Sequence, residues 1–248
     1  MIVLKTSREL ELMKQAGRIA ARALQEGLLA VKPGVTTLEV NRRIHDCITA
    51  MGAKPSFLGY GGFPAAACIS INQEVIHGIP GSRVIGEGDI VSIDVGALYK
   101  GFHGDNAATI GAGAVSKDAA QLMEVTAEAL QRGIAAAGPG GRIGDISAAV
   151  QSYAEQFGYG VVRQFVGHGV GAKLHESPEV PNYGTAGRGP RLAAGMTLAI
   201  EPMINQGSED VRVLADGWTV VTADSSLSAH FEHTIAITND GAVVLTQP

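Results

Sequence analysis

Apolar residues near the start of the chain recur every three or four positions, which is the period of an amphipathic helix. Thr6 and Glu9 have the spacing of a capping box, so we expect the helix to begin there. Lys-Pro-Gly at 32–34 ends this helix, and Thr36 with Glu39 predicts a second helix to about Met51. The apolar face of the first helix comprises Leu10, Met13, Ala16, Ala20, Ala23, Leu24 and Leu28.

Short apolar runs punctuated by glycine and proline follow to about residue 113 and predict strands. The order then begins again, with a helix from Ser116 to about Ala137, a Gly-Pro-Gly break, and a helix led by Asp145 to about Phe157. Segments 32–44 and 138–150 share a Pro-Gly break and apolar spacing, and 88–94 parallels 195–201. We therefore expect one domain over 1–248, built from two related halves of about 1–113 and 114–248.

Composition narrows the class of protein. Hydrophobic residues make up 46% and charged residues 17%, which excludes a disordered chain. The formal net charge is -5 without a basic run, so we expect no nucleic acid or anionic membrane as a partner. Cys47 and Cys68 form neither a disulfide framework nor a zinc-ribbon spacing. The N-terminal segment turns charged too early for a signal peptide, and we expect a cytoplasmic protein.

Four acidic residues stand in segments that otherwise resemble strands: Asp94, Asp105, Glu201 and Glu232. When the two halves are overlaid, Asp94 corresponds to Glu201 and Asp105 to Glu232. An aspartate near a strand end is commonly a turn former, which is the ordinary alternative for any one of them. Several buried acids would repel one another and take up protons, and a bound cation removes both costs. The pattern therefore favours a metal site.

His168 stands between two glycines and is the imidazole that best completes this set, although a lone histidine is more often a core residue. Four carboxylates and one imidazole suit Mn(II), Fe(II), Co(II) or Zn(II), and two carboxylates placed to bridge suit a pair of ions. The sequence thus indicates a catalytic centre with two divalent metals.

Two further histidines, His77 and His175, each precede a proline by three residues in roughly equivalent places of the two halves. Surface-turn positions and functional positions fit both of them equally well. For the remaining four histidines an ordinary structural role is expected: His45, His103, His230 and His233. Two of them, His103 and His230, are also candidates to support the metal ligands through hydrogen bonds.

These residues and their contexts resemble the metallopeptidases with a pita-bread fold, and within that group the type I methionine aminopeptidases. The resemblance extends over nearly the whole chain, through "GYGGFPAAACISINQEVIHGIPG", "IDVGALYKGFHGDNAATI", "FVGHGVGAKLHESP", "LAIEPM" and "LSAHFEHT". It implies an α+β fold in which two halves, related by a pseudo-twofold axis, pack helices on a curved antiparallel sheet.

The resemblance also implies a function: removal of the initiator methionine from nascent proteins and peptides with a small second residue. Hydrolysis would use a metal-activated water at a dinuclear centre. Asp94 would bind one metal, His168 and Glu201 the other, and Asp105 and Glu232 both.

The resemblance gives catalytic roles to three residues. Glu201 would also accept the proton of the water. His77 would contact the scissile amide, and His175 would hydrogen-bond its carbonyl oxygen.

For the methionine pocket, the resemblance implies Phe57, Tyr60, Phe63, Cys68 and Trp218. A plain core role fits Phe57 and Phe63 equally well, whereas Trp218, expected on a strand after a turn, is the better candidate for a pocket wall. Phe57 and Leu174 depart from the residues common in the family, which changes the outline of the pocket. The family further implies a monovalent cation near Asn72 and Ser228, a monomeric enzyme, and action on nascent chains at the ribosome.

Two alternatives remain open at this point. One is an X-Pro dipeptidase or aminopeptidase of the same fold, which the segment "ISINQEVIHGIPG" and the expected lack of an additional N-terminal domain disfavour. The other is a non-catalytic binding protein, because a fold does not fix a function. Such a protein is expected to have lost metal ligands or the two histidines. Here all seven positions are filled, the five candidate ligands and His77 and His175.

Overall fold

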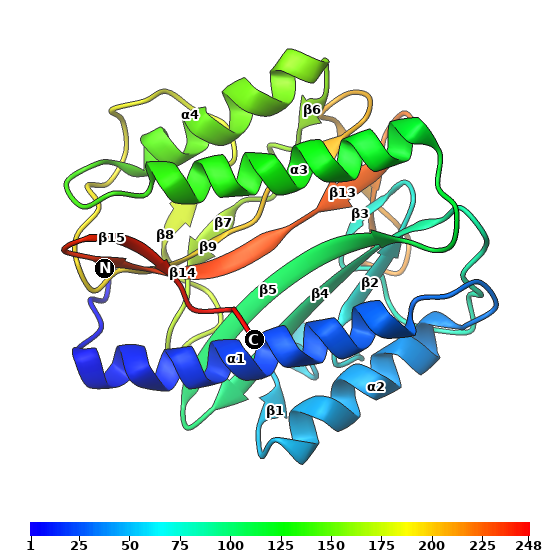
Figure 1. The fold of residues 1–248 in the computed structure, drawn as a ribbon, viewed down its shortest axis with the longest axis horizontal. Helices are drawn as coiled ribbons and strands as arrows, with labels where there is room; N and C mark the ends of the chain where they lie inside the picture. The colour runs from blue at the N-terminus through cyan, green and yellow to red at the C-terminus, as the bar shows by residue number, and fades with distance from the viewer.

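The computed structural model describes residues 1–248 and shows one curved, nine-stranded sheet with all four α-helices stacked along one side of it (Figure 1). Helices α1 and α2 lie below the middle of the sheet in that view, and α3 and α4 lie above it. Every strand pairing is antiparallel. The architecture is therefore α+β, as the sequence predicts.

The predicted helices are present with their predicted caps. Thr6 and Thr36 each accept a hydrogen bond from the backbone N–H three residues on, and the carboxylates of Glu9 and Glu39 accept one from the backbone N–H of the cap residue. Ser116 caps the third helix through the N–H of Ala119. The four helices are α1 (Ser7–Ala30), α2 (Thr37–Ala50), α3 (Lys117–Ala136) and α4 (Ile143–Ala154), with 3₁₀ turns at Tyr60–Gly62 and Glu155–Phe157.

Two boundaries differ from the prediction. The fourth helix begins at Ile143, two residues before Asp145, because the Asp145 carboxylate reaches back to the Arg142 N–H at 2.7 Å and so stands in the first turn. Trp218 is in the turn before a strand, where its N–H and that of Thr219 both bond to the Asp216 carboxylate at 2.9 Å. In both cases a nearby side chain accepts hydrogen bonds from backbone N–H groups, and the spacing of apolar residues does not predict such bonds.

The strands form one large and two small sheets. The large sheet has the order β1-β4-β5-β14-β9-β7-β8, with β15 on β14 and β2 on β4, and the small ones are β13-β10-β6 and β11-β12-β3. The strands are β1 Lys54–Pro55, β2 Cys68–Ile71, β3 Glu74–Ile76, β4 Ile90–Tyr99, β5 Phe102–Gly111, β6 Gly160–Val161, β7 Gly167–Gly169, β8 Glu176–Val180, β9 Thr197–Ile200, β10 Met203–Asn205, β11 Val211–Val213, β12 Val220–Thr222, β13 Ser228–His230, β14 Glu232–Thr238 and β15 Gly241–Val244.

Side-chain alternation along the strands separates a helix-facing core from the opposite face. In β4, Val91, Ile93 and Val95 pack into a cluster with residues of α1 and α2, and in β9 Leu198 and Ile200 pack against residues of α3 and α4. Residues between them point the other way, since successive strand residues face opposite sides. Asp94 is such a residue, and this is how an acid can interrupt an apolar strand without entering the core.

Glycine allows α1 to approach the sheet closely. A Cβ on Gly104 of β5 would lie 2.5 Å from the Cα and N of Gly17 in α1, so the two backbones are in direct contact. Because Gly104 immediately precedes Asp105, this contact fixes the strand position from which Asp105 projects.

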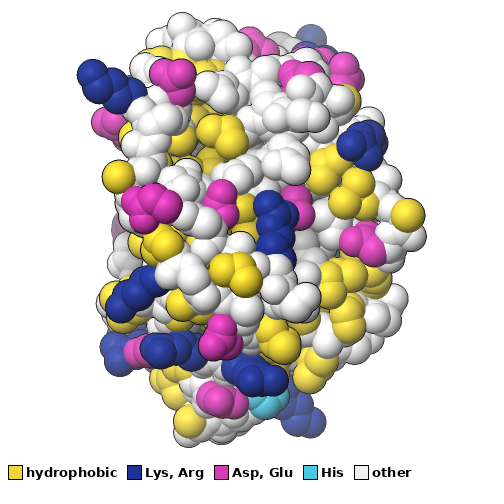
Figure 2. Space-filling model, turned by 90° about the vertical axis from the view of Figure 1, so that its right-hand side faces the viewer, with side chains coloured by type: hydrophobic (Ala, Val, Ile, Leu, Met, Phe, Trp, Pro, Cys, Tyr) yellow, Lys and Arg dark blue, Asp and Glu magenta, His cyan; other side chains and the backbone are white.

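The surface shown in Figure 2 is of mixed charge, with Lys and Arg side chains gathered in its lower part and Asp and Glu side chains among them. Hydrophobic side chains are scattered over this face. None of the helices combines the length and the apolar character that a membrane crossing requires.

Candidate metal centre and substrate pocket

Strand register brings the four predicted carboxylates together. Ala107 in the middle of the sheet pairs with Asp94 of β4 on one side and with Glu232 of β14 on the other. Asp105 lies two residues from Ala107 on the same strand and hence on the same face. His233 pairs with Ile200, so the next position along places Glu201, just past the end of β9, beside Glu232. A small residue at 107 leaves the space between the flanking acids open.

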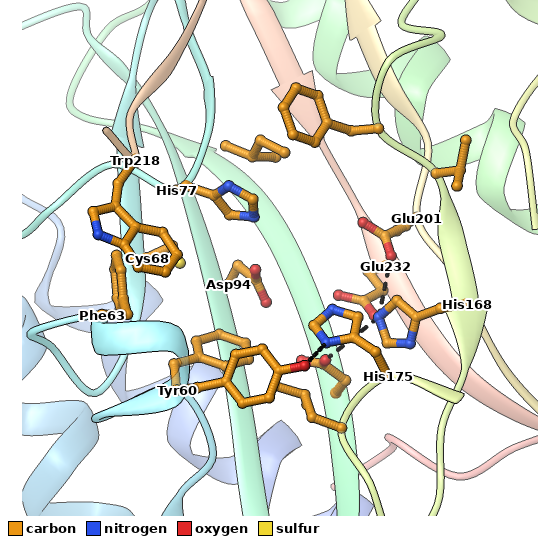
Figure 3. A pocket seen from close by; sticks show the side chains of 16 residues that line it. Tyr60, Phe63, Cys68, His77, Asp94, His168, His175, Glu201, Trp218 and Glu232 are labelled. Atoms are coloured by element: carbon orange, nitrogen blue, oxygen red, sulfur yellow. Dashed lines mark hydrogen bonds and ion pairs between the residues drawn. The ribbon is translucent and has the colours of Figure 1, made fainter. Parts of the chain in front are cut away.

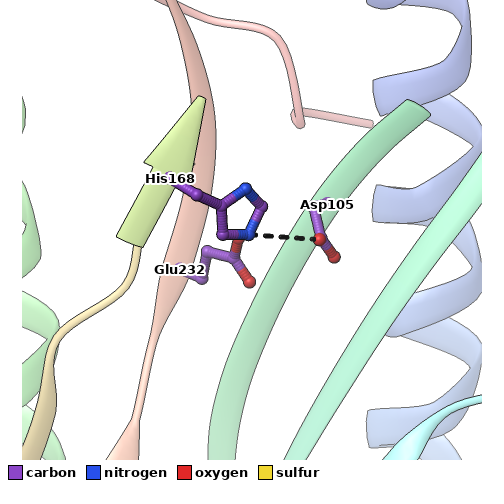
Figure 4. A group of neighbouring side chains, drawn as sticks. All are labelled: Asp105, His168 and Glu232. Carbon is purple, nitrogen blue, oxygen red and sulfur yellow. Dashed lines mark ion pairs between the residues drawn. The ribbon is translucent and has the colours of Figure 1, made fainter. Parts of the chain in front are cut away.

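His168 of β7 joins this cluster from the neighbouring strand (Figure 4). Its Nε2 atom lies 3.5 Å from Glu201 Oε1 and 4.0 Å from Asp105 Oδ2. Its Nδ1 lies 2.8 Å from the Gly169 carbonyl oxygen and donates to it, which leaves the Nε2 lone pair facing the acids. Ligand atoms of Asp105, His168 and Glu232 all lie within 4.8 Å of one another.

The cluster is electrostatically unfavourable without a cation. Asp94 Oδ1, Asp105 Oδ1 and Glu232 Oε1 are buried and have no hydrogen-bond partner. Burial raises the pKa of Asp105 to about 7. Burial, followed by the charges of neighbouring acids, raises the pKa of Asp94, Glu201 and Glu232 well above their ordinary range. Burial and the nearby His175 lower the pKa of His168 to about 4, so its imidazole is neutral at neutral pH.

These features fit a divalent metal site. Unpartnered carboxylate oxygens and one neutral imidazole nitrogen that line one cavity are the donors that such ions bind. The outward-directed bond from His168 Nδ1 to a carbonyl is the arrangement that orients metal-binding histidines. A buried unpaired carboxylate is otherwise expensive, and a cation compensates for all four at once.

The four acids, three histidines and five pocket residues named from the sequence all line one cavity of about 200 Å³ (Figure 3). In Figure 3, Glu201, Glu232 and His168 lie on one side and Phe63, Cys68 and Trp218 on the other, with Asp94 and His77 between them and His175 next to His168. The cavity therefore joins a polar centre to an apolar recess.

His175 is held by its neighbours on two sides. The Tyr60 hydroxyl lies 2.7 Å from His175 Nδ1, and the ring of His168 packs on the His175 ring with centroids 4.1 Å apart. Burial lowers the pKa of His175, which favours the neutral imidazole. A Tyr60 hydroxyl that donates to Nδ1 leaves the proton of the ring on Nε2, so His175 can present an N–H group to the cavity.

His77 occupies an unusual backbone position. Its φ is 59°, in the left-handed region that non-glycine residues rarely adopt. Its ring makes edge contacts with the rings of Phe165 and Trp218, with centroids 5.7 and 6.3 Å apart. Burial and then the nearby His175 lower the pKa of His77 to about 4. Such backbone strain concentrates at functional sites, and His77 lines the same cavity as the carboxylates.

The apolar recess is both core and pocket wall. Phe57, Phe63, Cys68 and Leu174 belong to one buried cluster, with the half-buried Trp218 packed against it and edge-on to Phe63 at 5.2 Å. Cys68 pairs with Asp94 across β2 and β4, and burial followed by the charge of Asp94 raises its thiol pKa well above the ordinary range. For Phe57 and Phe63, a role in the core and a role in the pocket wall are therefore compatible. Three lining residues escaped prediction: Ile76, Phe165 and Val166.

Only a neighbour in sequence could have signalled those three residues, since Ile76 precedes His77 and Phe165–Val166 precede the Gly-His-Gly segment. Two of the other histidines are satisfied within the fold: His103 Nδ1 lies 2.8 Å from Ser56 Oγ, and His233 Nδ1 lies 2.9 Å from Thr246 Oγ1. His230 is different, because its buried Nε2 has no partner and lies 3.8 Å from Glu201 Oε2. His230 therefore lies next to Glu201, which is a candidate metal ligand.

Comparison with known proteins decides the family. A model of metallopeptidase family M24 matches residues 11–239. The chain belongs to family M24. Methionine aminopeptidase 1 of Bacillus subtilis is 52% identical over 247 residues, covering 100% of both chains, and methionine aminopeptidase of Clostridium perfringens is 53% identical over 246 residues, covering 99% of each. Within M24 the chain therefore falls among the type I methionine aminopeptidases.

Solved structures agree with this placement. The crystal structure of methionine aminopeptidase from Thermotoga maritima has a TM-score of 0.99 and 48% identity and covers 100% of both chains. Prolidase from Pyrococcus furiosus shares the fold with a TM-score of 0.80 and 26% identity, over 99% of this chain and 66% of that one. The fold is thus the pita-bread fold of M24, as predicted from the sequence.

Membership of M24 makes this chain a metallo-exopeptidase, a hydrolase whose chemistry uses divalent metal ions, and within the family it is placed with the methionine aminopeptidases. That placement sets aside the non-catalytic alternative. The X-Pro alternative has weaker support, since the prolidase shares 26% identity against about half for the methionine aminopeptidases.

Proposed function

We propose that this enzyme removes N-terminal methionine from peptides and nascent proteins whose second residue is small, at a centre of two divalent metals. The observation that carries the proposal is the single cavity that joins four buried carboxylates and a neutral imidazole to an apolar, sulfur-containing recess. The names of the most similar relatives support the same substrate class.

The proposed ligand set is the one that the family resemblance implies. Asp94 would hold one ion, His168 and Glu201 the other, and Asp105 and Glu232 would contact both. When bound, the ions would polarise the substrate carbonyl and lower the pKa of a water to near neutrality. Mn(II), Fe(II), Co(II) and Zn(II) all suit these donors, because the choice among them depends on availability as much as on ligands.

The residues around the centre have separate roles in this proposal. Glu201 would accept the proton of the attacking water. The N–H of His175 would donate to the carbonyl oxygen as negative charge develops there, and Tyr60 would hold the ring in the required tautomer. His77 would contact the scissile amide. The recess around Phe63, Cys68 and Trp218 would take the methionine side chain, where sulfur–aromatic contacts are favourable.

The proposal includes further components. A monovalent cation is proposed near Asn72 and Ser228, which lie side by side with the Ser228 N–H donating to the Asn72 carbonyl at 2.9 Å. Asn72 also adopts a left-handed backbone, with φ of 59°. The family suggests a monomer, and the substrate class suggests a cytoplasmic enzyme that acts on nascent chains at the ribosome. The single 1–248 domain of two related halves remains a prediction.

The test is release of free methionine from Met-Ala-Ser and from Met-Leu-Ser. Purified protein would be assayed after chelation and again after Mn(II) or Co(II) is restored. We expect release from Met-Ala-Ser only, and only with metal. Turnover of an Ala-Pro peptide instead would favour the X-Pro alternative, and no release with any metal, from protein folded by circular dichroism, would refute the proposal.

A further inference from the structure

A buried ion pair lies directly beside the cavity and has no role in the function proposed above. Lys5, in the segment before α1, is only 8% exposed, and its Nζ lies 2.5 Å from Glu176 Oε2. Glu176 follows His175 in the chain. The pair therefore connects the N-terminal segment to the residue next to the proposed carbonyl-oxygen donor, across 171 residues of sequence.

Both members of the pair are held by further contacts. Lys5 Nζ also donates to the Val3 carbonyl at 3.2 Å, and the Lys5 backbone N–H donates to the Gly195 carbonyl at 2.7 Å. The second oxygen of Glu176, Oε1, accepts from the Lys173 N–H at 3.2 Å. One carboxylate thus binds the lysine and also closes the turn that leads into His175.

The loop from Gly171 to His175 is built around this pair. A Cβ on Gly171 would lie 2.5 Å from Glu176 Oε1 and 2.5 Å from Lys5 Cε, so the glycine makes room for both side chains. The Gly171 carbonyl accepts from the His103 N–H at 2.9 Å, which fixes the other end of the loop to β5. Leu174 and His175, which both line the cavity, lie between these two attachments.

Burying a lysine and a glutamate is unfavourable unless they are paired, and the pairing rarely stabilises a fold more than apolar residues would. Stability alone therefore explains this pair poorly. Its position explains it better, because a charge-assisted bond of fixed geometry holds a loop more precisely than apolar contact does.

We propose that Lys5, acting through Glu176, is a positioning residue for His175. The ion pair fixes the loop 171–175 so that the His175 N–H meets the developing oxyanion. This inference rests on the proposed function, since it presumes that His175 contacts the substrate. A misplacement of about 1 Å at a reacting group costs on the order of 100-fold in rate, so the effect should be visible in turnover.

The variants are Lys5→Met and Glu176→Gln, with Glu179→Gln as the matched control. Glu179 is exposed and lies on the same strand, β8, three residues further along. With Met-Ala-Ser as substrate at saturating Mn(II), we expect kcat to fall about tenfold to 100-fold in both test variants, less than the roughly 100-fold to 1,000-fold that is lost when an oxyanion donor is removed outright. KM should change far less. Lys5→Arg should lower kcat less than Lys5→Met does, because arginine keeps the positive charge.

A double-mutant cycle separates positioning from general destabilisation. In the His175→Ala background, Lys5→Met should lower kcat less than about twofold further, because residues that act through one another are not additive. An equal loss in both backgrounds would overturn the proposal, as would Lys5→Met with kcat within twofold of the unmodified enzyme.

Hydrogen exchange gives a readout that does not depend on catalysis. Peptides that contain residues 171–176 should exchange faster in Glu176→Gln than in Glu179→Gln, because the bond at the Lys173 N–H weakens. Glu176→Gln preserves shape and one acceptor, so it tests the proposal even if Lys5→Met fails to fold. Unchanged exchange in this segment would overturn the inference. If the unmodified enzyme released no methionine, the proposed function would fail, whereas the exchange result would still report on the loop.

Discussion

Asp105→Asn should have opposite effects on the metal-free and metal-bound protein. Asp105 is buried beside three other carboxylates, and its Oδ1 has no partner. Without metal, the negative charge of Asp105 destabilises the folded state, and asparagine removes that charge while keeping the shape. With metal, the same charge attracts the cation, and the neutral asparagine does not. We therefore expect the variant to be more stable than the unmodified protein in EDTA and less stable in saturating Mn(II).

The magnitude follows from the pKa of Asp105, which burial raises from 3.8 to about 7. At 1.36 kcal/mol per pKa unit, ionising this carboxyl costs the folded state about 4 kcal/mol relative to the unfolded chain. A folded pKa above the unfolded one means that the folded state binds the proton more tightly. Stability is therefore lost as the pH rises from about 4 to about 7, and the whole cost is present at pH 8.

The assay is thermal unfolding of both proteins in EDTA and in Mn(II), at pH 8 and at pH 5. At 2–4 °C per kcal/mol for a chain of this size, the variant should melt up to about 8–16 °C higher in EDTA at pH 8. At pH 5 the advantage should shrink to about half or less. Asp46→Asn, at an exposed position on α2, serves as the control and should change the melting temperature little. If Asp105→Asn melts lower than the unmodified protein in EDTA at pH 8, the reasoning about crowded carboxylates is wrong.

Three further predictions address packing, the oxyanion donor and the thiols. Gly104→Ala forces a Cβ against the backbone of α1 at 2.5 Å and should destabilise the protein by about 1–3 kcal/mol in chemical denaturation; an unchanged midpoint would contradict the close contact. Tyr60→Phe removes the 2.7 Å bond to His175 and should lower kcat for Met-Ala-Ser about threefold to tenfold, with KM nearly constant; equal kcat values would rule out a role in fixing the ring. Iodoacetamide should label the half-buried Cys47 of native protein and leave Cys68 unlabelled until the protein is unfolded. The reason is that burial raises the pKa of the Cys68 thiol well above its ordinary range, and mass spectrometry of the peptides would show the labelled sites.

Much of the fold was predictable because its signals are local. A capping box satisfies backbone groups within one turn, so Thr6 and Thr36 mark helix starts whatever the rest of the chain does. The start of α4 was predicted two residues late, because the Asp145 carboxylate accepts from the Arg142 N–H behind it and so stands inside the first turn. Its second contact, with the distant Gly187 N–H at 2.6 Å, has no local signal at all.

The candidate site was predictable for a chemical reason. An acid in an apolar strand needs compensation, and four such acids with one histidine indicate a cation before any coordinates are known. Resemblance to a family then supplied roles for His77 and His175, which the pattern alone left undecided. Phe165, by contrast, looks like any apolar residue, and only its edge contact with the His77 ring shows that it lines the cavity.

By itself, the sequence determined the helices and their caps and the family, and it predicted which acids share a cation. Tertiary structure alone decided that Ala107 stands between Asp94 and Glu232, and that Lys5 reaches Glu176 beside His175. The reason is physical: caps and apolar periodicity act over a few residues, whereas strand register and buried ion pairs join segments whose separation leaves no local trace.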